Sequence, residues 1–371
     1  MKKGTTENLF SPLKIGSLTV RNRLVRSATA ERLADPVNGA PGERLKAIYL
    51  ALAQGGVGTI VTGHAYVQLN GKCHPEMSSI AEDNLVPLWG EVIRLAQQAG
   101  ARVIMQINHG GASCDPAITP LTVSPSGVRT NPAAPSRELA EDEIASIISA
   151  FGQAARRARE AGLDGVQIHG AHGYLVSQFL TPRTNLRSDA WGGDSQHRLA
   201  FLLAVAAEIR RQVGSDYPVW IKLGVAGAPP DELTLVEGAA ATMACSQAGI
   251  DCIELSHALG MPSLAAKEEP AFFPLAQAVR QAVGPTVTLA LVNGFRHVRV
   301  MESVLASGLV QLVSLCRPLI AEPDLPLRLR QHLETRAACT RCDRCWPHSP
   351  GEGVACHNEH IQEHLHDQAA L

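Results

Sequence analysis

The sequence has no long hydrophobic run and no block of like charge. None of its segments approaches the roughly 18 uninterrupted apolar residues that a membrane-spanning helix needs. The first residues, MKKGTTENLFSPLKIG, include lysines but no apolar stretch of signal-peptide length, so we expect a cytoplasmic protein. Lysine and arginine are dispersed and the formal net charge is −2, which argues against nucleic-acid or membrane partners and favours a small-molecule substrate. The pattern leaves open whether the chain forms a homo-oligomer.

A GxGxxG fingerprint is also missing, and its absence bears on the fold. Open doubly wound sheets that bind dinucleotides usually carry this fingerprint in the first turn between strand and helix. The 371 residues are 45% hydrophobic and 18% charged, which is an ordinary globular composition. The length would suit two domains, but α/β barrels often exceed about 250 residues as one domain. The order of the predicted elements must therefore decide the domain count.

Eight short apolar runs recur along the chain, separated by intervals long enough for a crossover helix. Each run is nearly continuous in apolar residues, as expected of a parallel strand buried on both faces. The clearest interval, residues 141–162, has apolar residues at helical spacing, begins with acidic residues and ends at Gly162. These repeats predict an α/β fold, a (β/α)8 TIM barrel over residues 1–330, with the strands LVRSAT, TIVTGHA, VIMQINH, GVQIHGA, VWIKLGV, CIELSH, VTLALVN and LVSLCR. Before the first strand, LKIGSLTV alternates about Gly16 and Ser17 and predicts an N-terminal β-hairpin.

Four of the nine cysteines crowd into the C-terminal segment, residues 331–371. Two, two and ten residues separate them, a spacing typical of one site that holds zinc or an iron–sulfur cluster. We therefore predict a short Cys-rich, metal-binding extension after the barrel, with the ligands Cys339, Cys342, Cys345 and Cys356. The His-rich tail HNEHIQEHLHDQAAL is expected to be a solvated helix face, with weak metal chelation as the alternative.

The fourth predicted strand ends in a cluster of polar residues. His169, His172 and Tyr174 lie within six residues, at the C-terminal strand ends where barrels place their chemistry. Two imidazoles and a phenol there can converge on one ligand as hydrogen-bond donors and an acid. Packing is the alternative for a single histidine, and a catalytic metal in a hydrolase or aldolase barrel is an alternative for the pair, but no third ligand stands at a fixed spacing. His257, at the end of CIELSH, either reaches the same pocket or caps a loop.

The segment IHGAHGYLVSQFLTPRTNLRSDAWGGD resembles the signature of the old yellow enzyme family, including its bacterial NAD(P)H:flavin oxidoreductase branch. The resemblance extends from LFSPLKIGSLTVRNRLVRSAT through MQINHGG to CRPLIAEPDLP. It implies that FMN lies across the strand mouths and that NAD(P)H is the reductant. It also implies an ene reductase, in which hydride passes from reduced flavin to an activated C=C bond of an α,β-unsaturated carbonyl compound. A catalytically idle flavoprotein, or a redox or metal sensor on the same barrel, is the alternative.

The resemblance also assigns roles to single residues. It implies that His169 and His172 bind the substrate carbonyl oxygen and that Tyr174 donates the proton. The flavin ring is expected beside strand-end residues, and the phosphate beside the loops after the last two strands, so the implied cofactor-binding residues are Ser27, Ala28, Thr29, Gly63, Gln106, Lys222, Asn293, Gly294, Cys316 and Arg317. Cys316 stands where relatives often have glycine, which predicts a slightly altered backbone approach to the phosphate.

Larger relatives such as 2,4-dienoyl-CoA reductase carry a 4Fe–4S cluster at a similar point after the barrel, with two of the cysteine gaps one residue longer. Those relatives also have further nucleotide-binding domains, which do not fit within this chain. We therefore expect NAD(P)H to reduce FMN directly at the barrel mouth.

Overall fold

The computed structural model describes residues 7–130, 133–229, 233–261, 269–332 and 335–363. Within these residues, eight parallel strands pair in chain order, and pairing of the last strand with the first closes the ring. Every predicted run coincides with one strand, so the predicted (β/α)8 barrel is confirmed. The strands are β3 (Leu24–Arg26), β4 (Thr59–Val61), β7 (Arg102–Asn108), β10 (Gly165–Gly170), β11 (Val219–Gly224), β12 (Cys252–Ser256), β13 (Leu289–Leu291) and β14 (Leu312–Leu315).

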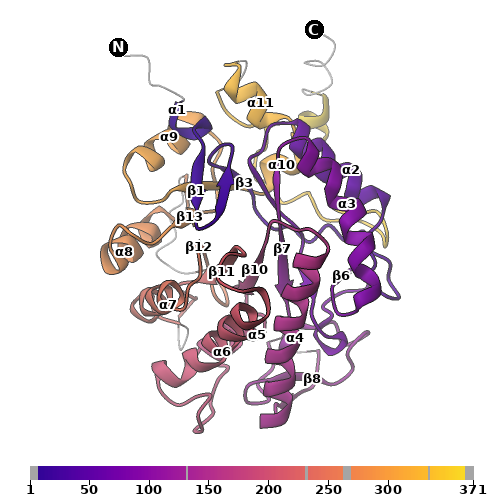
Figure 1. Ribbon diagram of the computed structural model, residues 1–371, viewed down its shortest axis with the longest axis vertical. Coiled ribbons are helices and arrows are strands. Elements are labelled where there is room, and N and C mark those ends of the chain that lie inside the picture. Colours follow the sequence, from indigo (N-terminus) through magenta and orange to yellow (C-terminus); the bar gives the residue numbers. More distant parts are fainter. Residues whose placement is uncertain (1–6, 131–132, 230–232, 262–268, 333–334, 364–371) are drawn as a thin grey trace.

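The short helix α1 (Glu7–Phe10) and the predicted hairpin precede the barrel. Strands β1 (Leu13–Ile15) and β2 (Leu18–Val20) are antiparallel, and Gly16 in their turn has a φ of +57°. Figure 1 shows the hairpin in front of the barrel strands. Its apolar side chains pack in one cluster with inward-facing strand residues, among them Val25, Ile104 and Trp220. The hairpin therefore plugs the end of the barrel at which the strands begin.

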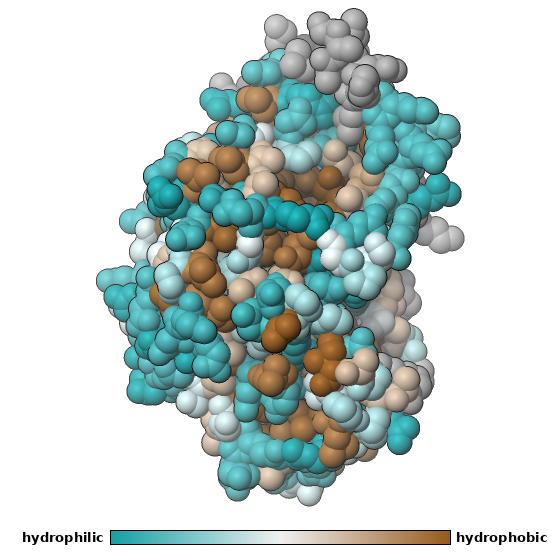
Figure 2. Space-filling view, turned by 90° about the vertical axis from the view of Figure 1, so that its right-hand side faces the viewer, coloured by the Kyte–Doolittle hydropathy of each residue, from teal (hydrophilic) through white to brown (hydrophobic). Residues whose placement is uncertain are grey.

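Helices surround the strands and cover their outward faces (Figure 1). The longest is α4, which coincides with the helix predicted over 141–162; its Glu143 side chain accepts a hydrogen bond from the Ala140 backbone N–H at 2.9 Å. The others are α2 (Glu43–Gln54), α3 (Val86–Gln98), α6 (Ser195–Val213), α7 (Leu235–Gln247), α8 (Phe273–Val283), α9 (Val298–Ala306), α10 (Arg317–Ala321) and α11 (Leu325–Arg330), with α4 itself spanning Glu141–Glu160. Hydrophilic side chains cover most of the face in Figure 2, with hydrophobic ones between them.

Short elements in the loops at the C-terminal strand ends enlarge the barrel mouth. The parallel pair β5 and β6 adds to the edge of β7, and β8 pairs with β9 further along the chain. These pieces are β5 (Ala65–Tyr66), β6 (Ser78–Ser79), β8 (Thr122–Ser124), β9 (Ser136–Glu138), the 3-10 turns η1 (Leu69–Gly71), η2 (Asp83–Leu85) and η3 (Gly111–Ser113), and α5 (Leu175–Leu180).

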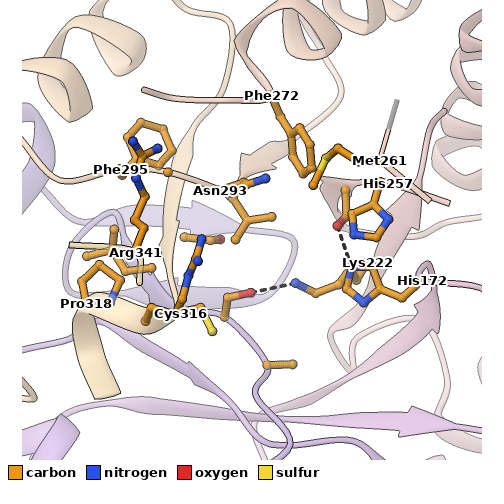
Figure 3. A pocket seen from close by; sticks show the side chains of 18 of the residues that line it. His172, Lys222, His257, Met261, Phe272, Asn293, Phe295, Cys316, Pro318 and Arg341 are labelled. Atoms are coloured by element: carbon orange, nitrogen blue, oxygen red, sulfur yellow. Dashed lines mark hydrogen bonds between the residues drawn. The ribbon is translucent and has the colours of Figure 1, made fainter. Parts of the chain in front are cut away.

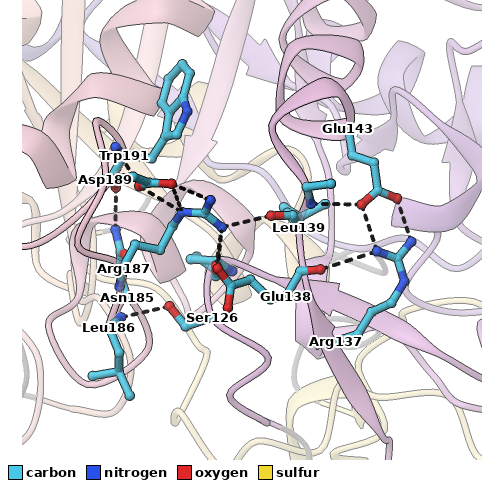
Figure 4. Close-up of polar contacts among 12 residues, drawn as sticks. Ser126, Arg137, Glu138, Leu139, Glu143, Asn185, Leu186, Arg187, Asp189 and Trp191 are labelled. Carbon is cyan, nitrogen blue, oxygen red and sulfur yellow. Dashed lines mark hydrogen bonds and ion pairs between the residues drawn. The ribbon is translucent and has the colours of Figure 1, made fainter.

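A buried arginine joins two of these loops (Figure 4). The Arg187 guanidinium donates to the backbone carbonyls of Pro125 and Leu139, both at 2.8 Å, and forms ion pairs with Glu138 at 3.0 Å and Asp189 at 2.5 Å. Its side chain is only 7% exposed. The buried Arg187 guanidinium therefore fixes the loop after α5 to the β8–β9 unit.

The C-terminal extension lies against the loops after β3. The Val354 backbone N–H donates to the Glu31 carbonyl at 3.0 Å, and Arg44 of α2 donates to the carbonyls of Gly351 and Glu352. The predicted division at residue 330 stays a prediction, and residues 364–371 of the His-rich tail lie outside the described part of the chain. No helix of the described residues is long and apolar enough to cross a membrane.

We expect Arg187→Ala to lower the free energy of unfolding by about 2–4 kcal/mol, because two carbonyls and two carboxylates lose a buried donor. Denaturant unfolding of the purified variant measures this. Arg137→Ala is the control: Arg137 also pairs with a carboxylate, Glu143, but is 44% exposed, and its loss should cost no more than about 1 kcal/mol. Equal costs would show that Arg187 does not fix the loops.

Candidate active site

A cavity of about 410 Å³ opens at the C-terminal strand ends (Figure 3), within the range typical of small-molecule sites. Lys222 and His172 lie on one side of it and Arg341 and Pro318 on the other. The residues that line it include Ser27, Ala28, His172, Lys222, Ser256, His257, Asn293, Gly294, Ser314, Cys316, Arg317 and Arg341. Many of the residues named from the sequence therefore share one cavity, although their roles stay predictions.

A buried polar network lies beneath this cavity. Lys222 donates to Ser27 Oγ at 2.7 Å and lies 3.0 Å from Glu254 Oε2, and both charged side chains are at most 3% exposed. Ser27 donates to Glu254 Oε1 at 2.8 Å, Gln167 donates to Glu254 Oε2 at 3.0 Å, and Gln106 Nε2 donates to the side-chain oxygen Oε1 of Gln167 at 2.8 Å. Burial alone would raise the pKa of Glu254, but the Lys222 charge and these hydrogen bonds lower it below its ordinary value. The carboxylate is therefore charged and balances the buried lysine.

His169, His172 and Tyr174 lie together at the end of β10. The ring centroid of His169 is 5.1 Å from that of His172 and 4.7 Å from that of Tyr174, both edge-on. His172 has a φ of +60°, and its side chain lines the cavity, where Nε2 lies 2.8 Å from Ser256 Oγ. His64, from the end of β4, packs against Tyr174 at 5.2 Å. The three residues predicted from one motif thus form one cluster, of which only His172 lines the main cavity.

Burial sets the charge state of this cluster. It lowers the pKa of His169 and of His172 well below the ordinary value, with nearby cations adding to the effect, and it lowers the pKa of His64 to about 4. It raises the pKa of Tyr174, and the neighbouring thiols Cys73 and Cys114 raise it further. At neutral pH the imidazoles are therefore uncharged and the phenol keeps its proton.

The far side of the cavity is suited to an anion. Arg317 and Arg341 line it, and Arg317 forms an ion pair with Asp343 of the extension. Ser314 Oγ is buried and has no hydrogen-bond partner within the described part of the chain. Asn293 and Gly294 have φ angles of +89° and +90°, so the loop after β13 turns sharply here. Two guanidinium groups and an unused hydroxyl are the donor set that a phosphate needs.

Three of the predicted cofactor-binding residues are close to the cavity without lining it. Thr29 Oγ1 is 3.1 Å from Cys316 Sγ, and Gln106 belongs to the network below the floor. Gly63 packs against Glu31: a Cβ built there would be 1.9 Å from Glu31 Oε2, and its N–H donates to Glu31 Oε1 at 3.1 Å. A side chain at position 63 would collide with the Glu31 carboxylate, which explains the glycine there. Arg26 lies 3.0 Å from this carboxylate and balances its charge.

Several site residues were not predicted from the sequence. Glu254 could have been found, because it is the one acidic residue in the apolar run CIELSH. His64 also ends a predicted strand, TIVTGHA, where the same search for polar strand ends applies. His257 lines the cavity, and its ring lies 4.6 Å from that of His172. Of the two positions that the sequence allowed for His257, the structure shows the one in the pocket. Arg341 lies in the extension and gave no such signal.

The four cysteines of the extension differ in exposure. Cys339 and Cys345 are buried, Cys356 is half-buried and Cys342 is exposed. Among the described residues, no three of these thiols bring their sulfur atoms within 4.8 Å of one another. Burial raises the pKa of Cys345 to about 11, and the charges of the neighbouring thiols add to this: Cys339, Cys356, Cys316 and Cys342. Cys345 is therefore close enough to the other thiols to interact with them electrostatically, although no three of the described thiols lie mutually within 4.8 Å.

A closed (β/α)8 barrel with a cavity at the C-terminal ends of its strands is the architecture in which barrel enzymes place their active sites. The chain belongs to the NADH:flavin oxidoreductase / NADH oxidase family, the family of old yellow enzyme, whose model matches residues 8–336. The resemblance stated from the sequence is thereby confirmed.

Individual relatives and solved structures are similar to this chain over most of its length. The chain is 33% identical to an NADH oxidase of Thermoanaerobacter brockii over 91% of this chain and 53% of that protein. A structure of 2-naphthoyl-CoA reductase with 2-naphthoyl-CoA has a TM-score of 0.84 and 28% identity, covering 88% of this chain and 53% of the other. An old yellow enzyme homologue from Zymomonas mobilis, with a TM-score of 0.76 and 24% identity over 90% of this chain and 95% of the other, shares the fold. The chain spans about half the length of the first curated relatives that it matches.

The buried histidines predict how stability depends on pH. His64 has a folded-state pKa of about 4 against 6.5 in the unfolded chain, so the unfolded state binds more protons between these values. Its contribution to stability is present above pH 6.5 and is lost as the pH falls toward 4, by about 1.4 kcal/mol per pH unit. Denaturant unfolding at several pH values should show a shallower dependence for His64→Asn. An unchanged slope in this variant would show that His64 is not buried in its neutral form.

Proposed function

We propose that this protein is an FMN-dependent reductase that takes hydride from NAD(P)H and reduces the activated C=C bond of an α,β-unsaturated carbonyl compound. The observation that carries the proposal is the uncharged cluster of His169, His172 and Tyr174 at the edge of a cationic cavity. Membership of the family and the similarity to a 2-naphthoyl-CoA reductase support a flavin-dependent reductase.

The cavity residues fit FMN. Arg317, Arg341 and the unpaired Ser314 hydroxyl suit its phosphate, while Lys222 at the other end suits the pyrimidine side of the ring. When bound, FMN supplies the hydride-transfer chemistry. Lys222 would stabilise negative charge that develops there, and Glu254 holds its ammonium group in place.

The two histidines are suited to hold a carbonyl oxygen. His169 Nδ1 accepts a hydrogen bond from the Ala171 backbone N–H at 3.4 Å, so in the neutral ring the proton is on Nε2, which is then free to donate. The Ser256 hydroxyl can donate to His172 Nε2 at 2.8 Å, which leaves Nδ1–H of His172 for the ligand. Two fixed donors aimed at one oxygen would stabilise the charge that forms on it when hydride reaches the β-carbon.

Tyr174 would supply the proton for the α-carbon. Its raised pKa keeps the phenol protonated across the physiological range, and its ring lies directly against His169. A catalytic metal at the histidines is not favoured, because within the described residues no third histidine, cysteine or carboxylate joins His169 and His172 at metal-binding distance.

The expected partners are small molecules, as for other members of the family. We also propose that the protein acts in the cytoplasm, because four closely spaced cysteines that serve as metal ligands suit a reducing compartment. We also propose that copies of this chain associate into a homo-oligomer.

Tyr174→Phe should separate the two half-reactions. FMN bound to the purified protein should bleach on anaerobic addition of NAD(P)H and recover its absorption on addition of a cyclic enone. We expect the variant to keep the first rate and lose about 10²–10⁴-fold in the second, because only the proton donor is missing. Stopped-flow absorption at the flavin bands measures both rates.

Tyr66→Phe is the control, since Tyr66 belongs to the cluster against which Tyr174 packs but donates to the Asn38 backbone carbonyl at 3.1 Å. It should leave both rates unchanged. If NAD(P)H bleaches the flavin and no enone restores it, the idle flavoprotein is the better description. If Tyr174→Phe slows both half-reactions equally, Tyr174 is not the proton donor.

We further propose that the four cysteines hold an iron–sulfur cluster rather than zinc. Thiolates on one zinc ion, with bonds of about 2.3 Å, would lie roughly 3.8 Å apart, whereas among the described residues no three of these thiols lie mutually within 4.8 Å. In a cluster each cysteine binds a different iron atom, so a wider arrangement around Cys345 is suitable.

Chemical analysis of anaerobically purified protein should find iron and inorganic sulfide in equal amounts. Cys345→Ser should lose both, because the central ligand is missing, whereas Cys245→Ala, a buried cysteine of α7, should keep both. Stoichiometric zinc without sulfide would contradict the cluster.

A further inference from the structure

A second group of metal-binding side chains lies outside the cavity and outside the four cysteines. It belongs to residues 347–357, which we call the His–Glu–His loop. Among the described residues, His348, Glu352 and His357 are the only three such side chains whose candidate ligand atoms all lie within 4.8 Å of one another. Nothing in the proposed reaction uses these residues.

The distances are close to those of a bound ion. Ligand atoms about 2.0–2.1 Å from a tetrahedral zinc ion lie roughly 3.4 Å apart. His357 Nε2 is 3.9 Å from Glu352 Oε1, and the ring centroids of His348 and His357 are 4.4 Å apart with 30° between the planes. Small rotations of these side chains would bring all three onto one ion.

Two further observations point to a ligand. His357 Nε2 is buried and makes no hydrogen bond within the described part of the chain, which is costly for a ring nitrogen unless an ion or another partner binds it. Glu352 Oε2 accepts the backbone N–H groups of His348 at 2.6 Å and Ser349 at 3.1 Å, so this oxygen is already used. The carboxylate is thereby oriented with Oε1 toward His357, as outer hydrogen bonds orient metal ligands.

We propose that His348, Glu352 and His357 bind one divalent transition-metal ion of the zinc class. Two imidazoles and one carboxylate are a borderline N and O donor set, which suits zinc and excludes calcium and magnesium, because these prefer oxygen ligands. Three protein ligands leave a fourth position for water or an exogenous group. The site shares no ligand with the four-cysteine cluster, although His357 directly follows the proposed cluster ligand Cys356.

The site would stabilise one wall of the barrel mouth. A cavity of about 220 Å³ separates the His–Glu–His loop from Arg32, Pro75 and Glu76, which belong to loops after β3 and β5. Arg44 and Glu31 already anchor the far end of the loop. A bound ion would join the beginning of the loop, at His348, to that anchored end.

Zinc binding to the full-length protein tests the site. After anaerobic purification with the cysteine cluster in place, the chain is dialysed against Zn²⁺ and analysed for zinc, iron and thiols. We expect one more zinc per chain in the wild type than in His348→Gln/His357→Gln, with iron and thiol content equal. Glu352→Gln should weaken zinc binding at least about 10-fold, because the charged ligand becomes a neutral amide.

His360→Gln is the control, since His360 is 97% exposed and is not part of the His348, Glu352 and His357 group. It should bind zinc as the wild type does. Cu²⁺ in place of zinc gives a second readout, because its electron paramagnetic resonance spectrum should show coupling to two ring nitrogens that the double variant loses. The single variant His348→Gln changes an exposed residue only, so its fold is not at risk. Equal zinc content and equal spectra in the wild type, in His348→Gln and in His348→Gln/His357→Gln would overturn the proposal, whether or not the reductase activity is found.

Discussion

The buried ion pair of Lys222 and Glu254 is the interaction on which the barrel mouth depends. Either charge alone would be very costly in the barrel interior, so the pair exists only because Ser27, Gln167 and Gln106 complete its hydrogen bonds. These five side chains come from five different strand positions around the ring and form a polar layer above the apolar plug of the hairpin. The layer fixes the position and direction of the Lys222 ammonium group, which lines the cavity above it.

Burial leaves Lys222 charged but leaves the nearby histidines uncharged. Lys222 has a partner and lies in a charged pair, whereas no carboxylate of the described residues forms an ion pair with His169 or His172, and both rings are uncharged at neutral pH. The same burial that discharges the imidazoles holds the proton on Tyr174. One physical effect thus produces both hydrogen-bond donors and a weak acid within a few ångströms, which is the combination that polarising a carbonyl and protonating a carbon require.

The strands and the main helices could be predicted because their signals are local and repeated: apolar runs of strand length, and Gly at helix ends. The motif at the end of β10 was equally local, so its three residues could be assigned to one cluster. The short strands β5, β6, β8 and β9 could not, because two or three residues carry no periodic pattern. The pairing of Lys222 with Glu254, or of Arg317 with Asp343, depends on contacts between distant parts of the chain, and no sequence spacing specifies them.

The contact between Arg317 and Asp343 has a thermodynamic consequence. Arg317 begins α10 at the barrel mouth, and Asp343 lies between two of the clustered cysteines of the extension. An anion that engages Arg317 competes with Asp343 for the same guanidinium group, so occupancy of the cavity and the position of the extension are energetically coupled. Such coupling is reciprocal: whatever orders the extension changes the affinity of the cavity by the same factor. Under the proposed function, a metal that orders the extension would therefore also change how tightly the cavity holds an anion.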